Sequence, residues 1–409
     1  MPPVTPYAYR EARDMLAAAA RPIGTERIPL AACAGRVLAQ DLIAVCDVPP
    51  FDRSPFDGYV LRSEDTLAAS KETPVTLRIL EEIPASCVPR FALTAGTASK
   101  ILTGAPIPNG GDAVVPFEHT SFTETEVTVY APLKSGHNIV RIGEDIRRGT
   151  LLCQCGQRID AGVMGSLAGQ NVVEPLVYRR PRVAILSTGI ELVELGHDLA
   201  PGKIRDTNRY SMAAAVSRLG MEAVMVPSAV EDRVEAIAEA MEKALADCDA
   251  LITTGGVSVG DYDLTPAAME AVGAEILFGK VDLKPGMACA YGLREGKMLC
   301  GLSGNPASSI TNFYAVALPA LRRLCGLRDY ATHEFPVTLA ERFGKKSPSN
   351  RLLRGFADVS DGTVKLRLSE GQGNVMISGL IGCDLAALIP AGSGPVEAGT
   401  VLKGFFLDR

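Results

Sequence analysis

The sequence lacks the features that mark membrane proteins, nucleic-acid-binding proteins and secreted proteins. It contains no run of eighteen apolar residues, which argues against a membrane span. Its 41 Lys and Arg against 47 Asp and Glu leave a formal net charge of −6, so it lacks the excess of basic residues that is typical of nucleic-acid-binding proteins. Charges at Arg10, Glu11, Arg13 and Asp14 interrupt the first twenty residues, unlike the layout of a signal peptide. We therefore expect a cytoplasmic protein that binds neither membrane nor nucleic acid.

Cysteine and histidine are too scattered to build a disulfide framework or a zinc site. The ten cysteines include one close pair, Cys153 and Cys155, and no second pair completes a metal site. The four histidines lie far apart along the chain. Neither G-x-G-x-x-G nor G-x-x-x-x-G-K-[ST] is present, which argues against a dehydrogenase and a P-loop enzyme. A length of 409 residues, 47% of them hydrophobic, is enough for roughly two to three globular domains.

The most informative stretch runs from a predicted strand into a glycine turn. Residues 249–254 are apolar and partly β-branched, which predicts a buried strand that ends at Gly255-Gly256. Glycines at this point permit positive φ and a close approach of the main chain to a ligand. Ser258 adds a hydroxyl and Asp263 adds a carboxylate, so the pattern favours a phosphate ester bound with a hard cation such as Mg²⁺. An ordinary strand–turn–helix connection has the same pattern.

Strands and helices alternate between residues 182 and 324, which predicts a mostly parallel sheet with helices on both faces. Three predicted loops follow strands, at 187–192, 254–265 and 301–308, and parallel strands bring such loops to one edge of the sheet. The carboxylates expected to converge there are Glu191, Asp232, Asp261 and Asp263. The segment 305–308 begins a helix, whose free N–H groups favour an anionic ligand.

Several of these residues have a second interpretation. Asp232 and Glu235 form a D-x-x-E pattern that is typical of a helix cap, and a capping residue can also bind a metal. Asp57, in a proline-rich loop, is by itself typical of a turn cap. Lys280 and Lys284 bring positive charge near the glycine loops, although most lysines are solvated surface residues. Acidic and basic groups around glycine loops together favour a phosphorylated ligand held through a divalent cation.

The flanking segments predict simpler modules. Residues 7–20 are rich in helix formers and predict a helix, and an apolar patch near Ala34 to Leu38 predicts another. Alternating residues between 74 and 133 predict a small β module that contains a turn-dense loop at Thr103. Short strands with Gly and Pro turns over 333–409 predict a small closed or sandwiched β domain.

Eight short motifs, each weak alone, are spread over nearly the whole chain. They are Pro50-Phe-Asp-Arg-Ser-Pro-Phe-Asp-Gly-Tyr59, Leu102-Thr-Gly-Ala-Pro-Ile-Pro108, Arg141-Ile-Gly-Glu-Asp145, Ser187-Thr-Gly-Ile-Glu-Leu192, Asp206-Thr-Asn-Arg209, Thr254-Gly-Gly-Val-Ser-Val-Gly260, Lys284-Pro-Gly286 and Gly301-Leu-Ser-Gly-Asn-Pro306. In this combination and order the sequence closely resembles the molybdopterin molybdotransferases, the molybdenum-insertion enzymes of molybdenum-cofactor biosynthesis, which include the gephyrin E domain.

The resemblance implies an α/β multidomain protein with four parts. Residues 179–328 form a mostly parallel α/β sandwich domain that binds molybdopterin, and residues 329–409 form a C-terminal β-barrel-like domain. A small β-rich insertion domain, 47–140, interrupts a discontinuous mixed α/β domain made of 1–46 and 141–178. The resemblance also implies an elongated homodimer, whose active cleft lies between the α/β domain of one subunit and the insertion domain of the other.

The implied reaction takes adenylylated molybdopterin and molybdate as substrates. A divalent cation, usually Mg²⁺, assists hydrolysis of the adenylate, the dithiolene sulfurs receive molybdenum, and molybdenum cofactor and AMP are released. Such a reaction needs charge neutralisation and positioning more than a protein nucleophile. Molybdopterin adenylyltransferases and molybdoenzymes are the partner proteins that the resemblance suggests.

The motifs also imply roles for individual residues. Those implied to hold the metal and phosphates are Glu191, Asp232 and Asp263. Those implied to be catalytic are Asp57, Asp263, Lys280 and Lys284. Those implied to bind substrate are Thr103, Arg141, Asp145, Ser187, Gly255, Gly256, Ser258, Ser303, Asn305 and Pro306. Those implied to reach the cleft from the other subunit are Asp57, Thr103, Arg141 and Asp145.

Three positions depart from the family pattern. Ser303 stands where the family usually has proline, Ile190 where it usually has an acidic residue, and Phe56 where it often has methionine. Ser303 removes a constraint on φ, and Ile190 removes a carboxylate. These departures leave open an alternative: a divergent paralogue that binds molybdopterin or molybdenum cofactor as a carrier or scaffold without catalysis. The retained carboxylates Asp57 and Asp263 favour the enzyme.

Overall fold

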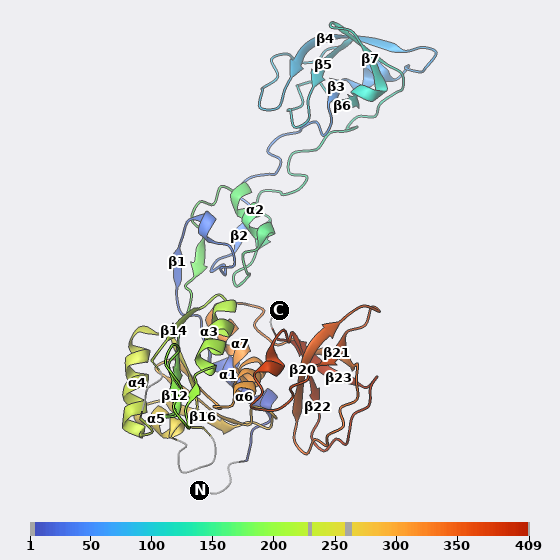
Figure 1. Cartoon of the computed structure of the whole chain (residues 1–409). Coiled ribbons are helices and arrows are strands. Elements are labelled where there is room, and N and C mark those ends of the chain that lie inside the picture. Colours follow the sequence, from blue (N-terminus) through green and yellow to red (C-terminus); the bar gives the residue numbers. More distant parts are fainter. Residues whose placement is uncertain (1–4, 228–230, 258–263, 408–409) are drawn as a thin grey trace. The chain divides into compact units, whose positions relative to one another are not determined.

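The computed structural model describes residues 5–227, 231–257 and 264–407 (Figure 1). Contacts divide the chain into two compact units. The first unit contains residues 1–40, 155–161 and 174–409, and the second contains residues 41–154 and 162–173. Each unit has its own sheets and its own hydrophobic core. The four domain boundaries that the family resemblance implies stay a prediction.

The first unit is built on a six-stranded sheet with the order β14-β11-β15-β18-β17-β16. Its strands are β11 (Arg182–Ser187), β14 (Glu222–Met225), β15 (Ala250–Thr254), β16 (Glu275–Lys280), β17 (Ala288–Arg294) and β18 (Lys297–Leu302). The strands β14, β11, β15 and β18 run parallel, as the alternation of strands and helices predicts. Because β17 is antiparallel to both of its neighbours, β16 runs in the same direction as β18. The carboxyl ends of β11, β15, β18 and β16 therefore meet at one edge.

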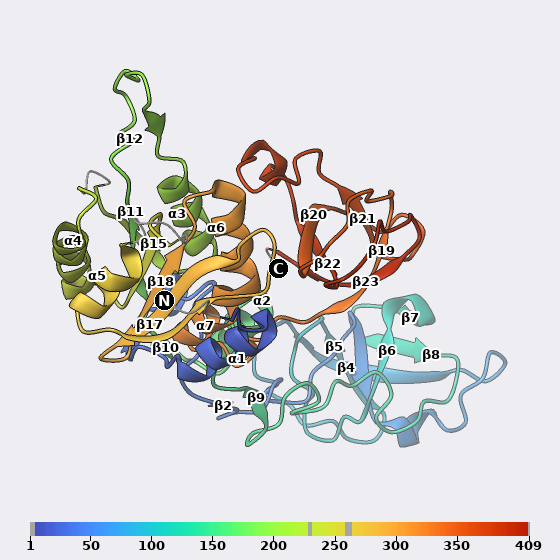
Figure 2. The same ribbon diagram turned by 90° about the horizontal axis from the view of Figure 1, so that it is seen from below.

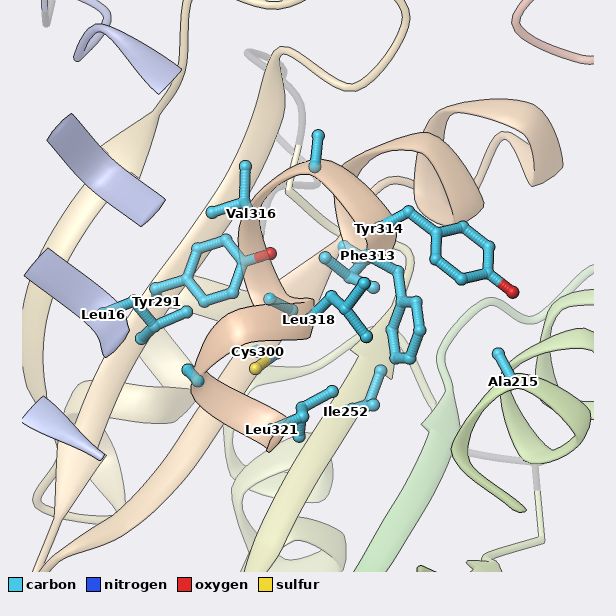
Figure 3. Packing of buried hydrophobic residues seen from close by; sticks show 14 of the residues in the cluster. Leu16, Ala215, Ile252, Tyr291, Cys300, Phe313, Tyr314, Val316, Leu318 and Leu321 are labelled. Carbon is cyan, nitrogen blue, oxygen red and sulfur yellow. The ribbon is translucent and has the colours of Figure 1, made fainter. Parts of the chain in front are cut away.

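Helices cover both faces of this sheet. They are α1 (Tyr9–Ala19), α3 (Asn208–Arg218), α4 (Val234–Asp247), α5 (Thr265–Ala271), α6 (Pro306–Asn312), the π-helical η4 (Phe313–Ala317) and α7 (Leu318–Leu324). Successive residues of a strand face opposite sides. In β11, Val183 and Ile185 pack with α1, α3, η4 and α7, whereas Ala184 and Leu186 pack with α4 and α5. Figure 3 shows the first cluster, in which side chains of η4 and α7 lie against Ile252 of β15.

The predicted helix from Asn305 to Leu324 is confirmed as the continuous run α6, η4 and α7. The π-helical turn ends at Ala317, two residues before Pro319, which has no N–H to donate within the helix. Nearly every residue of this run is buried, so it forms the centre of the first unit. Across the three described segments, no helix combines the length and the apolar character that crossing a bilayer requires.

The first unit ends in a closed five-stranded barrel with the order β19-β21-β20-β22-β23. Its elements are β19 (Phe335–Leu339), β20 (Arg351–Asp358), β21 (Lys365–Leu368), η5 (Ser378–Leu380), β22 (Leu385–Ile389) and β23 (Val401–Phe406). Inward-facing residues such as Val337, Leu353 and Leu366 fill the interior. Closure leaves no unpaired strand edge. The predicted α/β multidomain fold class with a C-terminal barrel-like domain is confirmed.

The second unit contains the predicted β-rich module. Its six-stranded sheet has the order β6-β3-β5-β4-β8-β7. The elements of this unit are β2 (Leu42–Ile43), β3 (Gly58–Leu61), η2 (Ser63–Thr66), β4 (Val75–Ile83), β5 (Thr97–Ile101), β6 (Ala113–Pro116), η3 (Phe117–His119), β7 (Thr120–Phe122), β8 (Glu126–Val129), β9 (Leu151–Cys153) and α2 (Ala161–Gly169). Both faces of the sheet are buried, because Tyr59 and Leu61 belong to one cluster and Val60 and Ile101 to another.

One predicted helix is wrong. The remaining short elements of the first unit are η1 (Leu30–Ala32) and the strands β1 (Thr25–Arg27), β10 (Leu176–Tyr178), β12 (Leu192–Val193) and β13 (Ile204–Arg205). The apolar patch near Ala34 to Leu38 is not helical, because Val37 and Leu38 form isolated bridges with Arg158 and Val177. Pairing with a segment far away in sequence buries these side chains, and local helix propensity does not register such a partner.

Candidate active site

A cavity of about 480 Å³ opens at the carboxyl ends of β11, β15 and β18. The structure brings together there the three loops that the alternating pattern places at one edge. The lining residues are Thr188, Gly189, Glu191, Leu192, Ile204, Arg205, Asp206, Thr207, Asn208, Asp232, Ile237, Thr254, Gly255, Gly256, Val257, Leu264, Ser303, Gly304, Asn305 and Pro306. Parallel neighbouring strands explain the convergence, since their ends open onto the same side of the sheet.

The glycine turn after β15 leaves no room for side chains. Gly255 and Gly256 have φ angles of 107° and 63°, which L-residues rarely adopt. A Cβ on Gly255 would lie 2.5 Å from the Thr188 carbonyl oxygen, and one on Gly256 would lie 2.7 Å from Thr265 Oγ1. The N–H of Gly255 donates to the Leu302 carbonyl at 2.9 Å, so this amide joins two loops of the wall instead of facing a ligand. The turn therefore shapes the floor of the cavity through close backbone approach.

Two predicted metal ligands, Glu191 and Asp232, line this cavity. Both are exposed to solvent. The carboxylate of Glu191 folds back over Gly189, where a Cβ would come within 2.6 Å of Glu191 Oε2. The two acidic side chains stand on different walls, one following β11 and the other preceding α4. Their oxygens are of the hard type that Mg²⁺ prefers.

The expected capping role of Asp232 is wrong. Helix α4 begins at Val234 with Arg233 in the N-cap position, and no side-chain hydrogen bond caps it. Asp232 lies one residue further from the helix, and Glu235 pairs with Arg233 at 3.8 Å. Asp232 is therefore left to face the cavity.

A buried polar network lies beneath the cavity and includes Asp206, which the sequence analysis did not place among the site residues. The hydroxyl of Ser187 donates to Asp206 Oδ1 at 3.0 Å and lies 3.0 Å from Thr254 Oγ1. Ser187 is 1% exposed and does not line the cavity, so it supports the floor. Asp206 is 2% exposed, lines the cavity and accepts the Arg209 N–H at 3.1 Å. Its place in the Asp206-Thr-Asn-Arg209 motif was the available signal.

The third wall is the loop between β18 and α6, which contains Ser303, Asn305 and Pro306. The N–H of Asn305 donates to Ser303 Oγ at 3.3 Å, so the serine in the usual proline position holds the loop by a hydrogen bond. Asn208 Nδ2 donates to the Gly304 carbonyl at 2.7 Å and connects this wall to α3. Ile190, another departure from the family pattern, is 61% exposed and does not line the cavity.

The lysines predicted to face the substrate lie at the same edge of the sheet without lining the cavity. Lys280 ends β16, which runs in the direction of β18 but is separated from it by β17. Lys284 follows in an exposed position, and its backbone pairs with the barrel through the Asn350 carbonyl at 2.8 Å and the Leu352 N–H at 2.9 Å. The role of these two lysines at a bound anion therefore stays a prediction.

Four predicted site residues belong to the second unit. Asp57 Oδ1 accepts hydrogen bonds from Thr103 N–H at 2.7 Å and from Thr103 Oγ1 at 2.8 Å. The backbone hydrogen bond and then the hydroxyl hydrogen bond hold the pKa of Asp57 below its ordinary value. Arg141 pairs with Asp52 at 2.7 Å, and Asp145 is exposed, with its N–H donating to the Val48 carbonyl. The Asp57–Thr103 pair is a preformed surface feature of this unit.

The predicted residues Ser258, Asp261 and Asp263 lie outside the described residues. Within the described segments, no group of three or more His, Cys, Asp and Glu side chains is placed to hold a metal ion by itself. The two described carboxylates still fit Mg²⁺, because this ion usually takes one or two carboxylates and completes its shell with water and substrate phosphate.

Comparisons with known proteins find relatives over nearly the whole chain. Residues 7–170 match the family model described as the MoeA N-terminal region (domain I and II), and residues 184–323 match the one described as a probable molybdopterin binding domain. A molybdopterin molybdenumtransferase of Staphylococcus epidermidis is 34% identical over 398 residues, covering 97% of this chain and 95% of that protein. The corresponding protein of Staphylococcus aureus strain Mu50 is 35% identical over 366 residues, covering 89% and 86%.

A solved structure gives the same result at the level of the fold. The molybdopterin biosynthesis MoeA protein from Pyrococcus horikoshii superposes with a TM-score of 0.83 and 29% sequence identity, over 99% of both chains. The likeness therefore includes both compact units and the C-terminal barrel. By its sequence relatives, its two matched domains and its fold, the chain belongs to the MoeA family of molybdopterin molybdenumtransferases.

Proposed function

We propose that this chain is a transferase that inserts molybdenum from molybdate into adenylylated molybdopterin and releases AMP. The observation that carries the proposal is the cavity at the carboxyl edge of the sheet. Glycine turns and the carboxylates of Glu191, Asp206 and Asp232 line it, in a chain that matches this family over 97% of its length. Its volume of about 480 Å³ falls within the range of small-molecule sites. No feature of the cavity specifically favours a carrier without catalysis.

The reaction requires the protein to neutralise the negative charge of the phosphates and to position them. Water attacks one phosphorus of the phosphoanhydride, and the bond from that phosphorus to the bridging oxygen breaks. The attacked phosphate gains the water oxygen, the other phosphate keeps the bridging oxygen, and the protons of water pass to these phosphates or to solvent. The two products are AMP and the phosphate of the pterin. A bound Mg²⁺ would supply Lewis-acid stabilisation of the charge that develops on the phosphate oxygens. Glu191 and Asp232 are the described residues that would hold it, with Asp263 as the further expected ligand.

The chain's own groups then bind and orient the substrates. The close backbone approach at Gly255 and Gly256 admits the phosphate-bearing part of the ligand to the floor. The wall of Ser303, Asn305 and Pro306 borders the same space with polar groups. We assign Lys280 and Lys284 to the attraction of molybdate and the phosphates, because a cationic surface beside the cavity raises the local concentration of an anion.

The proposal also covers the oligomeric state, the cellular compartment and the partner proteins. As the family resemblance implies, a homodimer would complete each site with Asp57, Thr103, Arg141 and Asp145 of a second subunit. The enzyme would work in the cytoplasm, between a molybdopterin adenylyltransferase that makes its substrate and molybdoenzymes that take up its product. The Asp57–Thr103 pair supports the proposed homodimer, because it presents an ionised carboxylate on the surface of the second unit.

The experiment that tests the function is single-turnover release of AMP from adenylylated molybdopterin, with and without molybdate and Mg²⁺. We expect release to require Mg²⁺ and molybdate, and to fall at least about tenfold in Glu191→Gln and Asp232→Asn because each loses a charged metal ligand. The matched control is Glu270→Gln, an exposed acid on α5 outside the cavity lining, which should release AMP at the wild-type rate.

Two results would contradict the proposal. Wild-type protein that binds the adenylylated substrate tightly but releases no AMP under any condition would favour the carrier. Equal AMP release by the wild type and the two cavity variants would place the chemistry elsewhere in the molecule.

A further inference from the structure

Residues 188–205, here called the flap, leave the sheet after β11 and return to it before α3. Figure 2 shows the flap, with β12, projecting beyond the end of β11. Its internal order comes from the parallel pair β12–β13 and from the Ile204 N–H, which donates to the Glu191 carbonyl at 2.9 Å. The flap includes the cavity-lining carboxylate Glu191, so its position relative to the sheet decides where that carboxylate stands.

Most of the flap has little hydrophobic anchorage. Ile190, Leu195, Leu199 and Ile204 are each about half exposed or more, so these apolar side chains do not fasten the flap to the sheet. Segments with few buried apolar contacts open at a low free-energy cost. Polar contacts must therefore stabilise the position of the flap.

Arg209, in the first turn of α3, supplies such an attachment and is itself 4% exposed. Its Nη2 donates to Glu194 Oε2 in the flap. Its Nη1 donates to the Val226 carbonyl, directly after β14, at 2.8 Å. Its Nε lies 3.4 Å from Asp206 Oδ2, below the cavity floor. One guanidinium thus joins the flap, the segment that precedes α3 and the end of β14.

Two of these three contacts are made to residues that hydrogen bonds to β11 hold in place. Val226 continues β14, since its N–H donates to the Ile185 carbonyl in β11 at 2.9 Å. Asp206 is fixed by the hydroxyl of Ser187 at the end of β11. The guanidinium is planar and its donors point in set directions, so the hydrogen bond to Val226 and the ion pair with Asp206 direct Nη2 toward Glu194.

The cluster contains one cation, Arg209, and two carboxylates. Burial acts to lower the pKa of Arg209, but the hydrogen bond and charge of Glu194, followed by the charge of Asp206, raise it above its ordinary value. Arg209 is therefore a cation at every working pH, and it shares its charge between a buried carboxylate and a half-buried one in the flap.

We propose that Arg209 is a positioning residue that holds Glu191 at the cavity by fastening the flap, through Glu194, to the ends of β11 and β14. Glu194 lies three residues after Glu191, with β12 between them, so the clamp acts close to the carboxylate that it orients. This inference rests on the proposed function, because it assigns Glu191 to the metal and phosphates.

The test uses Glu194→Ala, which removes the flap side of the clamp and leaves Arg209 paired with Asp206, so that no buried charge is stranded. The matched control is Glu242→Ala, which removes an exposed acid held by Arg294 at 2.6 and 2.8 Å on α4. Hydrogen–deuterium exchange of the Ile204 amide reports the order of the flap. Titration with Mn²⁺ alone, read by electron paramagnetic resonance, reports the metal site without any substrate.

We expect Glu194→Ala to exchange about tenfold faster at Ile204, the effect of losing a hydrogen bond between charged groups. Its affinity for Mn²⁺ should fall about tenfold, as for the loss of a residue that orients a ligand. Glu194→Gln, which keeps an acceptor for Arg209, should recover part of both effects, and Glu242→Ala should show neither. Glu191→Gln should weaken Mn²⁺ binding without faster exchange, which identifies the metal signal with Glu191.

Unchanged exchange at Ile204 in Glu194→Ala, or faster exchange with unchanged Mn²⁺ affinity, would overturn the positioning role. Arg209→Lys gives a second check, because lysine keeps the charge but cannot reach three acceptors in fixed directions, and it should behave like Glu194→Ala. Failure of the proposed function is distinguishable: it would appear as wild-type protein that releases no AMP, whereas exchange and Mn²⁺ binding are measured without substrate.

Discussion

A single methyl group would change the floor of the cavity, because two residues there have backbone angles and neighbours that admit only glycine. Gly255 approaches Thr188, and Gly256 approaches Thr265, whose Oγ1 also donates to the Gly255 carbonyl at 2.8 Å. The turn is thus held from two sides, by the loop after β11 and by the start of α5. At the residue scale the site depends on the absence of side chains at Gly255 and Gly256 as well as on its carboxylates.

Gly256→Ala should therefore lower AMP release as well as stability. Its φ of 63° and the 2.7 Å approach to Thr265 Oγ1 are both unfavourable for a Cβ, and together they should cost about 1–3 kcal/mol and displace the floor. The control is Gly273→Ala, which has a similar φ of 78° but open space around the added Cβ. Thermal unfolding and AMP release measure the two effects. If Gly273→Ala loses as much activity as Gly256→Ala, backbone strain alone explains the loss.

The Asp57–Thr103 pair gives a prediction about ionisation. Thr103→Val removes the hydroxyl donor but keeps the N–H donor, so the pKa of Asp57 should rise toward its ordinary value of 3.8 and remain below it. The sign follows because both hydrogen bonds stabilise the charged form. A carboxyl-selective NMR titration measures the midpoint, with Thr76→Val on β4 as the control. An unchanged midpoint in Thr103→Val would show that the backbone amide alone sets the pKa.

At the scale of secondary-structure elements, helix α1 is fastened to the segment before β19 by one carboxylate. Glu334 accepts from Arg10 Nη2 at 2.7 Å, from Arg13 Nη1 at 3.3 Å and from Tyr9 OH at 3.3 Å. Burial acts to raise the pKa of Glu334, but the hydrogen bond and charge of Arg10, with Arg13, lower it below the ordinary value of 4.5. The first helix of the chain is thus connected to the start of the C-terminal barrel.

Glu334→Gln should destabilise the first unit by about 1–3 kcal/mol at pH 7, the range for hydrogen bonds to charged groups. Because the folded-state pKa is lowered, the stabilisation is fully present above the unfolded value near 4.5 and is lost as the pH falls through the lower folded value. The difference between wild type and variant should therefore shrink below pH 4.5. Urea unfolding across this range tests it, with Glu397→Gln, an exposed partner of Arg342, as the control. A difference that persists at low pH would contradict this explanation.

At the scale of the whole molecule, the family resemblance implies, and we propose, that two chains together form each active site. That proposal predicts complementation between inactive variants. Asp57→Asn and Asp232→Asn, mixed in equal amounts and allowed to exchange subunits, should regain about a quarter of wild-type AMP release, because half of the randomly formed dimers would contain one intact site. Neither variant alone should recover on the same treatment. Sedimentation of the mixture confirms the assembly state, and absent complementation among exchanged dimers would place both aspartates in the site of one chain.

Much of the α/β architecture could be predicted from the sequence, because it follows from local residue patterns and from the periodicity of apolar residues. Apolar strands followed by glycine, and helices with one apolar face, predicted the sheet edge at which β11, β15 and β18 end. That edge in turn predicted the convergence of Glu191, Asp232 and the glycine turn, which line one cavity. Residues 333–409 likewise carried enough short strands and turns to predict a closed β domain.

Other features depended on partners that lie far apart in the chain. The sequence by itself determined the fold class, the family and the edge of the sheet that carries the site, since these follow from hydrophobic period and motif order. Only the tertiary structure decided that Val37 and Leu38 pair with distant segments, that Asp232 misses the cap of α4, and that Ser187 lies under the floor. It alone revealed the clamp of Arg209, because a buried guanidinium selects its acceptors by distance and direction in space, and spacing along the chain records neither.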